Sequence, residues 1–148
     1  MEEDVIILPP NYKLYNDRSI YIGTFLGGPL VAGYLAAENF KQLGQRSAVK
    51  TAWIVAIIAT ILICSMVFLM PGIQNVPRIL IPLIYTGIAQ FVIYKYQGDS
   101  IKRHIAEGGK IYSPWRAVLI GIIGAVVLVA IIAIPVFLFL QGEITSPS

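Results

Sequence analysis

The chain has 148 residues, of which 57% are hydrophobic and 13% are charged. An average soluble domain is about 45–50% apolar and about 25% charged. The composition therefore excludes a disordered chain, an ordinary soluble enzyme and a nucleic-acid-binding domain, and it favours an integral membrane protein. A membrane-crossing helix needs about 20 mostly apolar residues, so four such helices and their connections occupy residues 1–148 as a single membrane domain.

In chain order, we expect an all-α, multi-pass protein with four transmembrane helices in a compact bundle. The predicted elements are an N-terminal tail (1–18), spans over 19–37, 48–70, 78–94 and 117–140, a polar loop over 95–116 and a C-terminal tail (141–148). Pro71-Gly72 stops the second span, since proline and glycine commonly follow helix ends.

Helix-capping patterns support these boundaries. Ser113-Pro114 places a capping hydroxyl before a proline at the first helical position of the fourth span. Ser47 caps the second span in the same way. Within the third loop, Asp99 or Ser100 caps a short separate helix over 101–107, which Gly108-Gly109 ends.

The distribution of lysine and arginine predicts the orientation, because basic loops stay in the cytoplasm. The loops after the first and third spans carry eight such residues, whereas the tails and the middle loop carry three. With four spans, this places both termini outside the cytoplasm and loops 38–47 and 95–116 inside it.

The first span is unusually rich in glycine. Its helix-packing or gate candidates are Gly23, Gly27, Gly28, Pro29 and Gly33. Three interpretations remain open. The segment is a kinked helix packed tightly against a neighbour, a broken helix whose free backbone groups bind an ion, or a re-entrant segment that does not cross the membrane. At its end, Glu38-Asn39 is either structural or a gate or partner contact.

Stripes of small residues mark two other spans. They recur at four-residue spacing as Ala52, Ala56, Thr60 and Cys64 on the second span, and as Ala117, Gly121 and Ala125 on the fourth. Small residues let helices approach closely, within one chain or between copies, so these stripes permit a homo-oligomer.

The third span carries the most polar stripe, formed by Pro82, Thr86, Gln90 and Tyr94 at four-residue spacing. An amide within the hydrocarbon region needs a hydrogen-bonding partner. Thr86, Gln90 and Tyr94 therefore either line a path for a small solute or form hydrogen bonds between helices, for example from Gln90 to Thr60 or Thr24.

No charged residue lies near the centre of any predicted span, which argues against proton relays, voltage sensors and ion-coupled transport. We find no motif for a catalytic site, cofactor or metal, and we expect a protein that is not an enzyme and does not bind nucleic acid. The predicted basic cytoplasmic loop contains Lys102, Arg103, Lys110 and Arg116. It reflects positive-inside bias or binds anionic lipid headgroups.

The segment from Phe25 to Gly44, together with Tyr96-Gln-Gly98 and Gly108-Gly109…Trp115-Arg116, resembles an uncharacterised family of small four-span bacterial inner-membrane proteins. The resemblance implies a bacterial inner-membrane location and the four-span fold over about residues 18–140, and no activity.

The leading functional prediction is a non-enzymatic membrane component that associates with itself or with a membrane protein partner through its glycine and alanine stripes. The alternative is an oligomeric channel or facilitator for an ion or small solute, lined by the third span.

Overall fold

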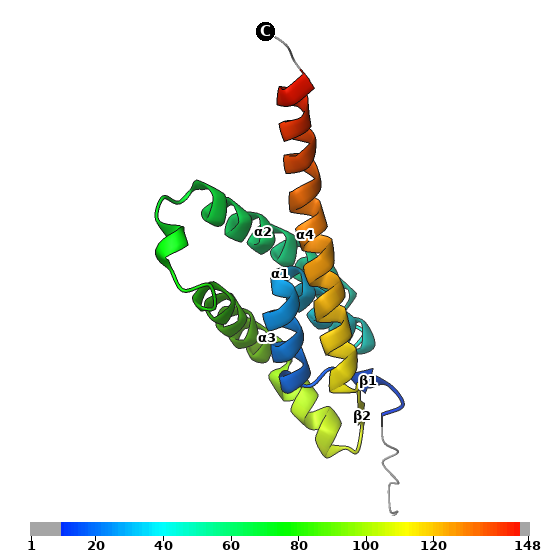
Figure 1. Ribbon diagram of the computed structural model, residues 1–148. Helices are drawn as coiled ribbons and strands as arrows, with labels where there is room; N and C mark the ends of the chain where they lie inside the picture. The colour runs from blue at the N-terminus through cyan, green and yellow to red at the C-terminus, as the bar shows by residue number, and fades with distance from the viewer. Residues whose placement is uncertain (1–9, 146–148) are drawn as a thin grey trace, which may run out of the picture.

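The computed structural model describes residues 10–145, and for Gln74 and residues 143–145 it describes the backbone alone. The residues 1–9 and 146–148 of the two predicted tails lie outside this part. The chain forms four helices: α1 (Asp17–Gln42), α2 (Arg46–Leu69), α3 (Leu80–Ala106) and α4 (Pro114–Thr145) (Figure 1).

Three short elements complete the fold. A turn of 3-10 helix, η1 (Ile73–Asn75), lies between α2 and α3. Two two-residue strands, β1 (Lys13–Leu14) and β2 (Lys110–Ile111), pair in parallel and tie the segment before α1 to the segment before α4.

The predicted all-α class is confirmed, and α1, α2 and α4 are long and apolar enough to cross a membrane. Helix α3 is equally long, with 27 residues, but falls outside this group because its C-terminal part is polar. Three of the four described helices therefore have the length and composition of a membrane span.

Helix α1 is not straight. Its backbone breaks at Gly28, where φ is 78° and ψ is −171°, a conformation that essentially only glycine adopts. In a straight helix, 24 residues would separate Tyr15 and Asn39 by about 36 Å. Instead, the Tyr15 N–H donates to Asn39 Oδ1 at 2.8 Å, and Asn39 Nδ2 donates to the Tyr15 carbonyl at 2.9 Å. The two halves of α1 therefore fold back into a helical hairpin.

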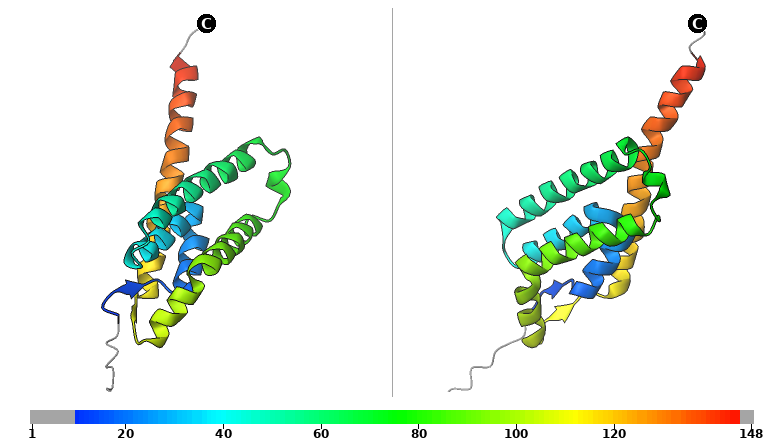
Figure 2. Two further views of the ribbon diagram at one scale, coloured as in Figure 1. Left: turned by 180° about the vertical axis from the view of Figure 1, so that it is seen from behind. Right: turned by 90° about the vertical axis from the view of Figure 1, so that its left-hand side faces the viewer.

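We call residues 17–27 arm A and residues 29–42 arm B of this hairpin. Arm A packs against α4, and arm B lies between α2 and α3 (Figure 2). Figure 2 also shows α2 and α3 side by side and inclined to α4, whose C-terminal half extends beyond the other helices.

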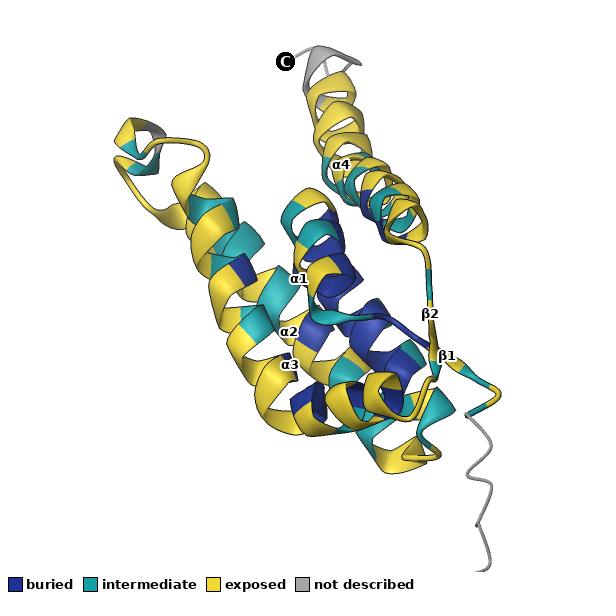
Figure 3. Cartoon of the chain, turned by 90° about the horizontal axis from the view of Figure 1, so that it is seen from below, coloured by how far each residue is buried: buried dark blue, intermediate teal, exposed yellow. Residues whose placement is uncertain are grey.

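Burial follows the same arrangement. In the most apolar 18-residue stretch of each helix, 67% of the residues of α1 are buried, compared with 6% in α2 and 11% in α4. Figure 3 shows the buried residues gathered on α1, with the other helices largely exposed. The core of the protein is therefore the hairpin, and the outer helices surround it.

Several predicted boundaries differ from the structure. The loop predicted over 95–116 is helical as far as Ala106, because α3 continues past Tyr94 without a break, so Asp99 and Ser100 do not cap a separate helix. Its end at Gly108, where φ is 77°, agrees with the predicted glycine stop. Ser47 does not cap α2, which begins after Gln45 without a side-chain cap.

Candidate functional site

The glycine-rich segment forms the apex of the hairpin. Gly27 and Gly28 are buried there beside Pro29, whose ring nitrogen cannot donate and leaves the Phe25 carbonyl without its helical partner. The Tyr85 hydroxyl of α3 donates to this carbonyl at 3.3 Å. The free backbone group at the break is thus bonded within the chain.

The glycines of arm A provide the contact with α4. A Cβ atom added to Gly23 would lie 3.2 Å from the Ala117 carbonyl oxygen, and one added to Gly27 would lie 2.7 Å from the Gly121 carbonyl oxygen. The predicted stripe on the fourth span, which begins with Ala117 and Gly121, therefore packs inside the same chain.

Gly33 provides the corresponding contact between arm B and α2. An added Cβ atom would lie only 2.2 Å from the Cβ atom of Ala56 and 3.1 Å from the Ala52 carbonyl oxygen. The last two residues of the predicted stripe on the second span, Thr60 and Cys64, have other surroundings. Thr60 donates to its own helix at the Ala56 carbonyl, and Cys64 lies near the apex, lining a small cavity of about 160 Å³.

A buried amide pair closes the base of the hairpin. Asn39 Nδ2 also donates to Gln97 Oε1 at 3.2 Å, and Gln97 Nε2 donates to the Ala36 carbonyl at 2.8 Å. Asn39 and Gln97 are both fully buried. Because α3 reaches arm B through these bonds, the pair fixes both the fold-back of α1 and the position of α3.

The polar face of α3 differs from the predicted one. Thr86 is fully buried, whereas Tyr94 is 45% exposed and receives a hydrogen bond from Lys102. Residues spaced by four drift around a helix by about 40° per step, so Thr86, Gln90 and Tyr94 do not share one face. The buried face instead follows the helical period, through Thr86, Ile93, Gln97, Ile101 and His104.

The hydrogen bonds predicted for Gln90 are not formed. Gln90 Oε1 is buried without a hydrogen-bonding partner, and so are the hydroxyls of Thr24 and Thr86. The buried oxygens of Thr86 and Gln90 on α3 therefore lack partners within the described chain, whereas the amide of Gln97, nearer the base of the hairpin, is paired.

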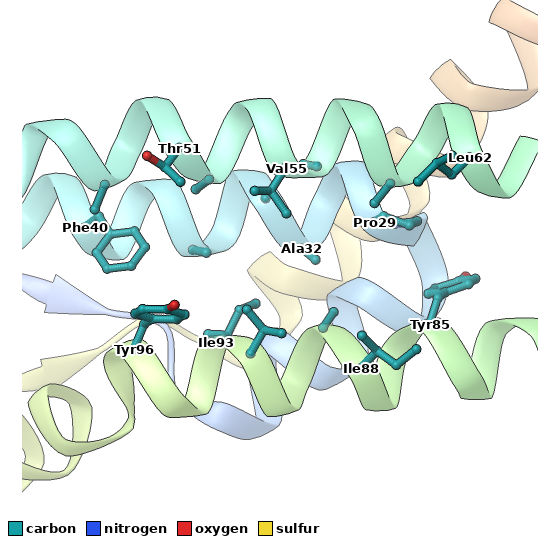
Figure 4. Close-up of a pocket in the computed structure, with 18 of the residues that line it drawn as sticks. Pro29, Ala32, Phe40, Thr51, Val55, Leu62, Tyr85, Ile88, Ile93 and Tyr96 are labelled. Atoms are coloured by element: carbon teal, nitrogen blue, oxygen red, sulfur yellow. The ribbon is translucent and has the colours of Figure 1, made fainter.

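An open apolar groove separates α2 from α3, with arm B as its floor (Figure 4). Its volume is about 720 Å³. Phe40 and Tyr96 lie at one end of the groove, and Leu62 and Tyr85 at the other. The small residues that line it are Ala32, Gly33, Ala36, Ala48, Ala52, Ala56, Ala59 and Ala89.

A cluster of aromatic rings lies at the base of the hairpin. The rings of Tyr15 and Tyr112 are 4.5 Å apart between centroids, and the Arg116 guanidinium lies 4.3 Å from the Tyr112 ring centre. The Tyr34 hydroxyl hydrogen-bonds with Arg116. Burial raises the pKa of Tyr15 to about 12, so this side chain stays neutral across the physiological range.

His104 joins the two strands to α3. Its Nε2 lies 2.8 Å from the Lys110 carbonyl oxygen, and its ring stacks on Tyr12 with centroids 4.7 Å apart. A Cβ atom on Gly109 would collide with the His104 ring, which explains the second glycine after α3.

The predicted basic residues are spread over three elements. Lys102 and Arg103 are exposed near the end of α3, Lys110 lies on β2, and Arg116 lies in the first turn of α4. Sequence reasoning did not identify Asn39, Gln97 and His104 as the buried polar core. The spacing of Gln97 and His104 from Ile93 and Ile101 could have revealed it.

Within residues 10–145, no three histidine, cysteine, aspartate or glutamate side chains group in a way that could hold a metal ion. Comparisons with protein-family models, curated proteins and solved structures found no match. The resemblance to small four-span bacterial proteins stays a prediction.

Proposed function

We propose that this protein is a non-enzymatic integral membrane component in which α2, α3 and α4 cross the bilayer around the re-entrant hairpin of α1. The observation that carries the proposal is the distribution of side chains. Thr24, Asn39, Thr86 and Gln97 are buried, whereas large aliphatic and aromatic residues cover the outside of α2 and α4. A water-soluble protein rarely exposes apolar patches of this extent, while a lipid environment favours such a surface.

The hairpin suggests an orientation different from that predicted by four spans. If α1 enters and leaves at one end, then the N-terminal segment lies with the loops 43–45 and 107–113, opposite the loop 70–79. Ten of the eleven lysine and arginine residues then fall at this basic end, and Arg78 alone falls at the other. The four-span topology divides the lysine and arginine residues eight against three, so the hairpin topology gives the stronger asymmetry. The positive-inside tendency then favours a cytoplasmic N-terminus with an external C-terminus.

Cysteine accessibility tests this topology in a Cys64→Ala background. Asn11→Cys, which lies at an exposed position before β1, should react with a membrane-impermeant maleimide only after the cells are permeabilised. Asn75→Cys, in the opposite loop, should react in intact cells, and Glu107→Cys should stay protected. Labelling of Asn11→Cys in intact cells would contradict the re-entrant topology and support a span at 19–37.

The role we propose is self-association of this membrane component through the groove between α2 and α3. The glycine and alanine stripes near Gly23 and Gly33 already pack inside one chain, so they leave little surface for contact with a second copy. The groove remains open, and its small side chains permit close approach of another helix. The free half of α4, which is apolar and without a neighbouring helix in the described chain, offers such a helix from a second copy.

Photo-crosslinking tests this role. In the Cys64→Ala background, Val55→Cys carries a benzophenone-maleimide in the groove, and Ile57→Cys carries it on the other side of α2. A dimer-sized product should form from Val55→Cys and not from Ile57→Cys. Equal dimer yields from the two positions, or lipid adducts alone, would contradict self-association through the groove.

A solute path lined by the third helix is the alternative role. The unpaired buried oxygens of Thr86 and Gln90 are the observation in its favour, although burial of Thr86 within one copy is unfavourable for a pore formed between copies. Solute or ion flux into liposomes that Gln90→Leu abolishes would support this alternative over self-association.

A further inference from the structure

The strands β1 and β2 place positive charges side by side. Lys13 and Lys110 are partners in the parallel register, and both are exposed. Neighbouring strands lie about 4.8 Å apart, and like charges directly opposite each other are destabilising. Among the described residues, no carboxylate forms an ion pair with either lysine. Within the described part of the chain, this pair of like charges is unfavourable, and an anion beside it would stabilise it.

Arg116 adds a third cation over the tyrosines that follow the two strands. The pairing continues for one step beyond the lysines, because Tyr112 N–H donates to the Leu14 carbonyl at 2.9 Å and the rings of Tyr15 and Tyr112 stack. The guanidinium of Arg116 lies over both rings, at 4.3 Å from Tyr112 and 5.9 Å from Tyr15.

No carboxylate that the structure describes acts on the Arg116 guanidinium. The groups that act on it are the three tyrosines Tyr15, Tyr34 and Tyr112. Aromatic faces and one hydroxyl hold the guanidinium in position, and no described carboxylate compensates its charge. Arginine in a fixed orientation is well suited to bind the oxygens of a phosphate group.

The position along α4 suggests which phosphate is bound. Trp115 is 77% exposed, and tryptophan is enriched at the membrane–water interface. The apolar part of α4 begins directly after Arg116. The three cations therefore lie at the depth of lipid headgroups, on the side that the proposed topology assigns to the cytoplasm.

We propose that Lys13, Lys110 and Arg116 form a binding site for the phosphate of an anionic phospholipid. This inference rests on the proposed membrane location. It is tested on purified protein in detergent micelles, where the orientation of the chain has no influence, so that its failure differs from failure of the topology.

Native mass spectrometry with added phosphatidylglycerol or phosphatidylcholine measures the binding. Each lysine near a charged headgroup contributes about fivefold in affinity. The double variant Lys13→Gln/Lys110→Gln should therefore lose about 25-fold in affinity for phosphatidylglycerol, and each single variant about fivefold. Binding of phosphatidylcholine should not change.

The matched control is Lys50→Gln/Lys95→Gln, which removes the same charge from exposed positions of α2 and α3 at the same end. It should lose less than about twofold in affinity if the site is local. Equal losses in both double variants would overturn the proposal in favour of a diffuse basic surface. So would equal binding of the two lipids by the unmodified protein, or displacement of phosphatidylglycerol by equimolar inorganic phosphate.

Discussion

The less apolar helix α1 is largely buried, whereas the more apolar helix α4 is largely exposed. The stretch of α1 is 67% buried and contains glycine and threonine, whereas the stretch of α4 is only 11% buried and consists almost entirely of aliphatic residues. In water, the more apolar helix would occupy the core. The inverse order follows when lipid surrounds the protein, because apolar side chains gain nothing by leaving lipid while small and polar groups allow close packing and hydrogen bonding.

The contrast between the buried helix α1 and the exposed helix α4 depends most strongly on Asn39, which holds the base of the α1 hairpin. In Asn39→Ala, the N–H and carbonyl of Tyr15 and Oε1 of Gln97 lose their partners inside the protein. Each unpaired buried group costs about 1–3 kcal/mol, so the loss of three partners should lower the free energy of unfolding by about 3–9 kcal/mol. Unfolding by dodecyl sulfate, followed by circular dichroism, measures this loss.

The control for this prediction is Gln42→Ala, three residues further along arm B. The side chain of Gln42 is half-buried and hydrogen-bonds only with Glu38, so its removal should cost less than about 1 kcal/mol. Equal losses from the two variants would show that the base of the hairpin is not held by Asn39.

A second test adds one methyl group to a buried glycine of α1 and one to an exposed glycine of α3. Gly33→Ala places a Cβ atom 2.2 Å from that of Ala56, and such overpacking typically costs about 1–3 kcal/mol. Gly87→Ala on α3 has no atom within 4 Å and should stabilise its helix by about 0.5–1 kcal/mol. The same unfolding assay compares the two variants.

A double variant tests the contact between Gly33 and Ala56 directly. The double variant Gly33→Ala/Ala56→Gly exchanges the two side chains across the contact and should recover most of the stability. If the second substitution lowers stability further, then arm B and α2 do not meet at these residues.

The smallest effect concerns pH. Burial raises the pKa of Tyr15 to about 12, above its ordinary value of 10.0, so the folded state holds this proton more tightly than the unfolded state does. The resulting stabilisation is complete below pH 10 and is lost as the pH rises from 10 toward 12. Tyr15→Phe keeps the ring and removes this dependence. The unfolding midpoint of the unmodified protein should fall relative to that of Tyr15→Phe between pH 9 and pH 11, and a constant difference would contradict the burial of Tyr15.

Much of the fold could be predicted from the sequence. The limits of α2 and the start of α4 at Pro114 follow from apolar length and proline chemistry, and a kink or a break in the glycine-rich first segment was among the open interpretations. The fold-back could not be predicted as the preferred interpretation, because a kinked helix and a hairpin share the same glycine and proline pattern. The angle between the arms depends on the long-range bonds of Asn39 with Tyr15 and Gln97.

The candidate site was only partly predicted from the sequence. The glycines of α1 were identified as packing positions, and their contacts with Ala56 and Gly121 agree with this expectation. The buried side of α3 was missed because the predicted stripe followed a strict four-residue spacing from Thr86 to Tyr94, whereas the buried residues Ile93, Gln97, Ile101 and His104 follow the helical period.

The fold-back of α1 is the central claim, and the distance between its two ends tests it most directly. With Cys64→Ala, spin labels at Arg18→Cys and Lys41→Cys occupy exposed positions at opposite ends of α1, and pulsed electron paramagnetic resonance in nanodiscs measures their separation. A continuous helix of this length would hold the labels about 35 Å apart. The hairpin predicts less than half of that distance, and a distribution centred near the full helical length would contradict it.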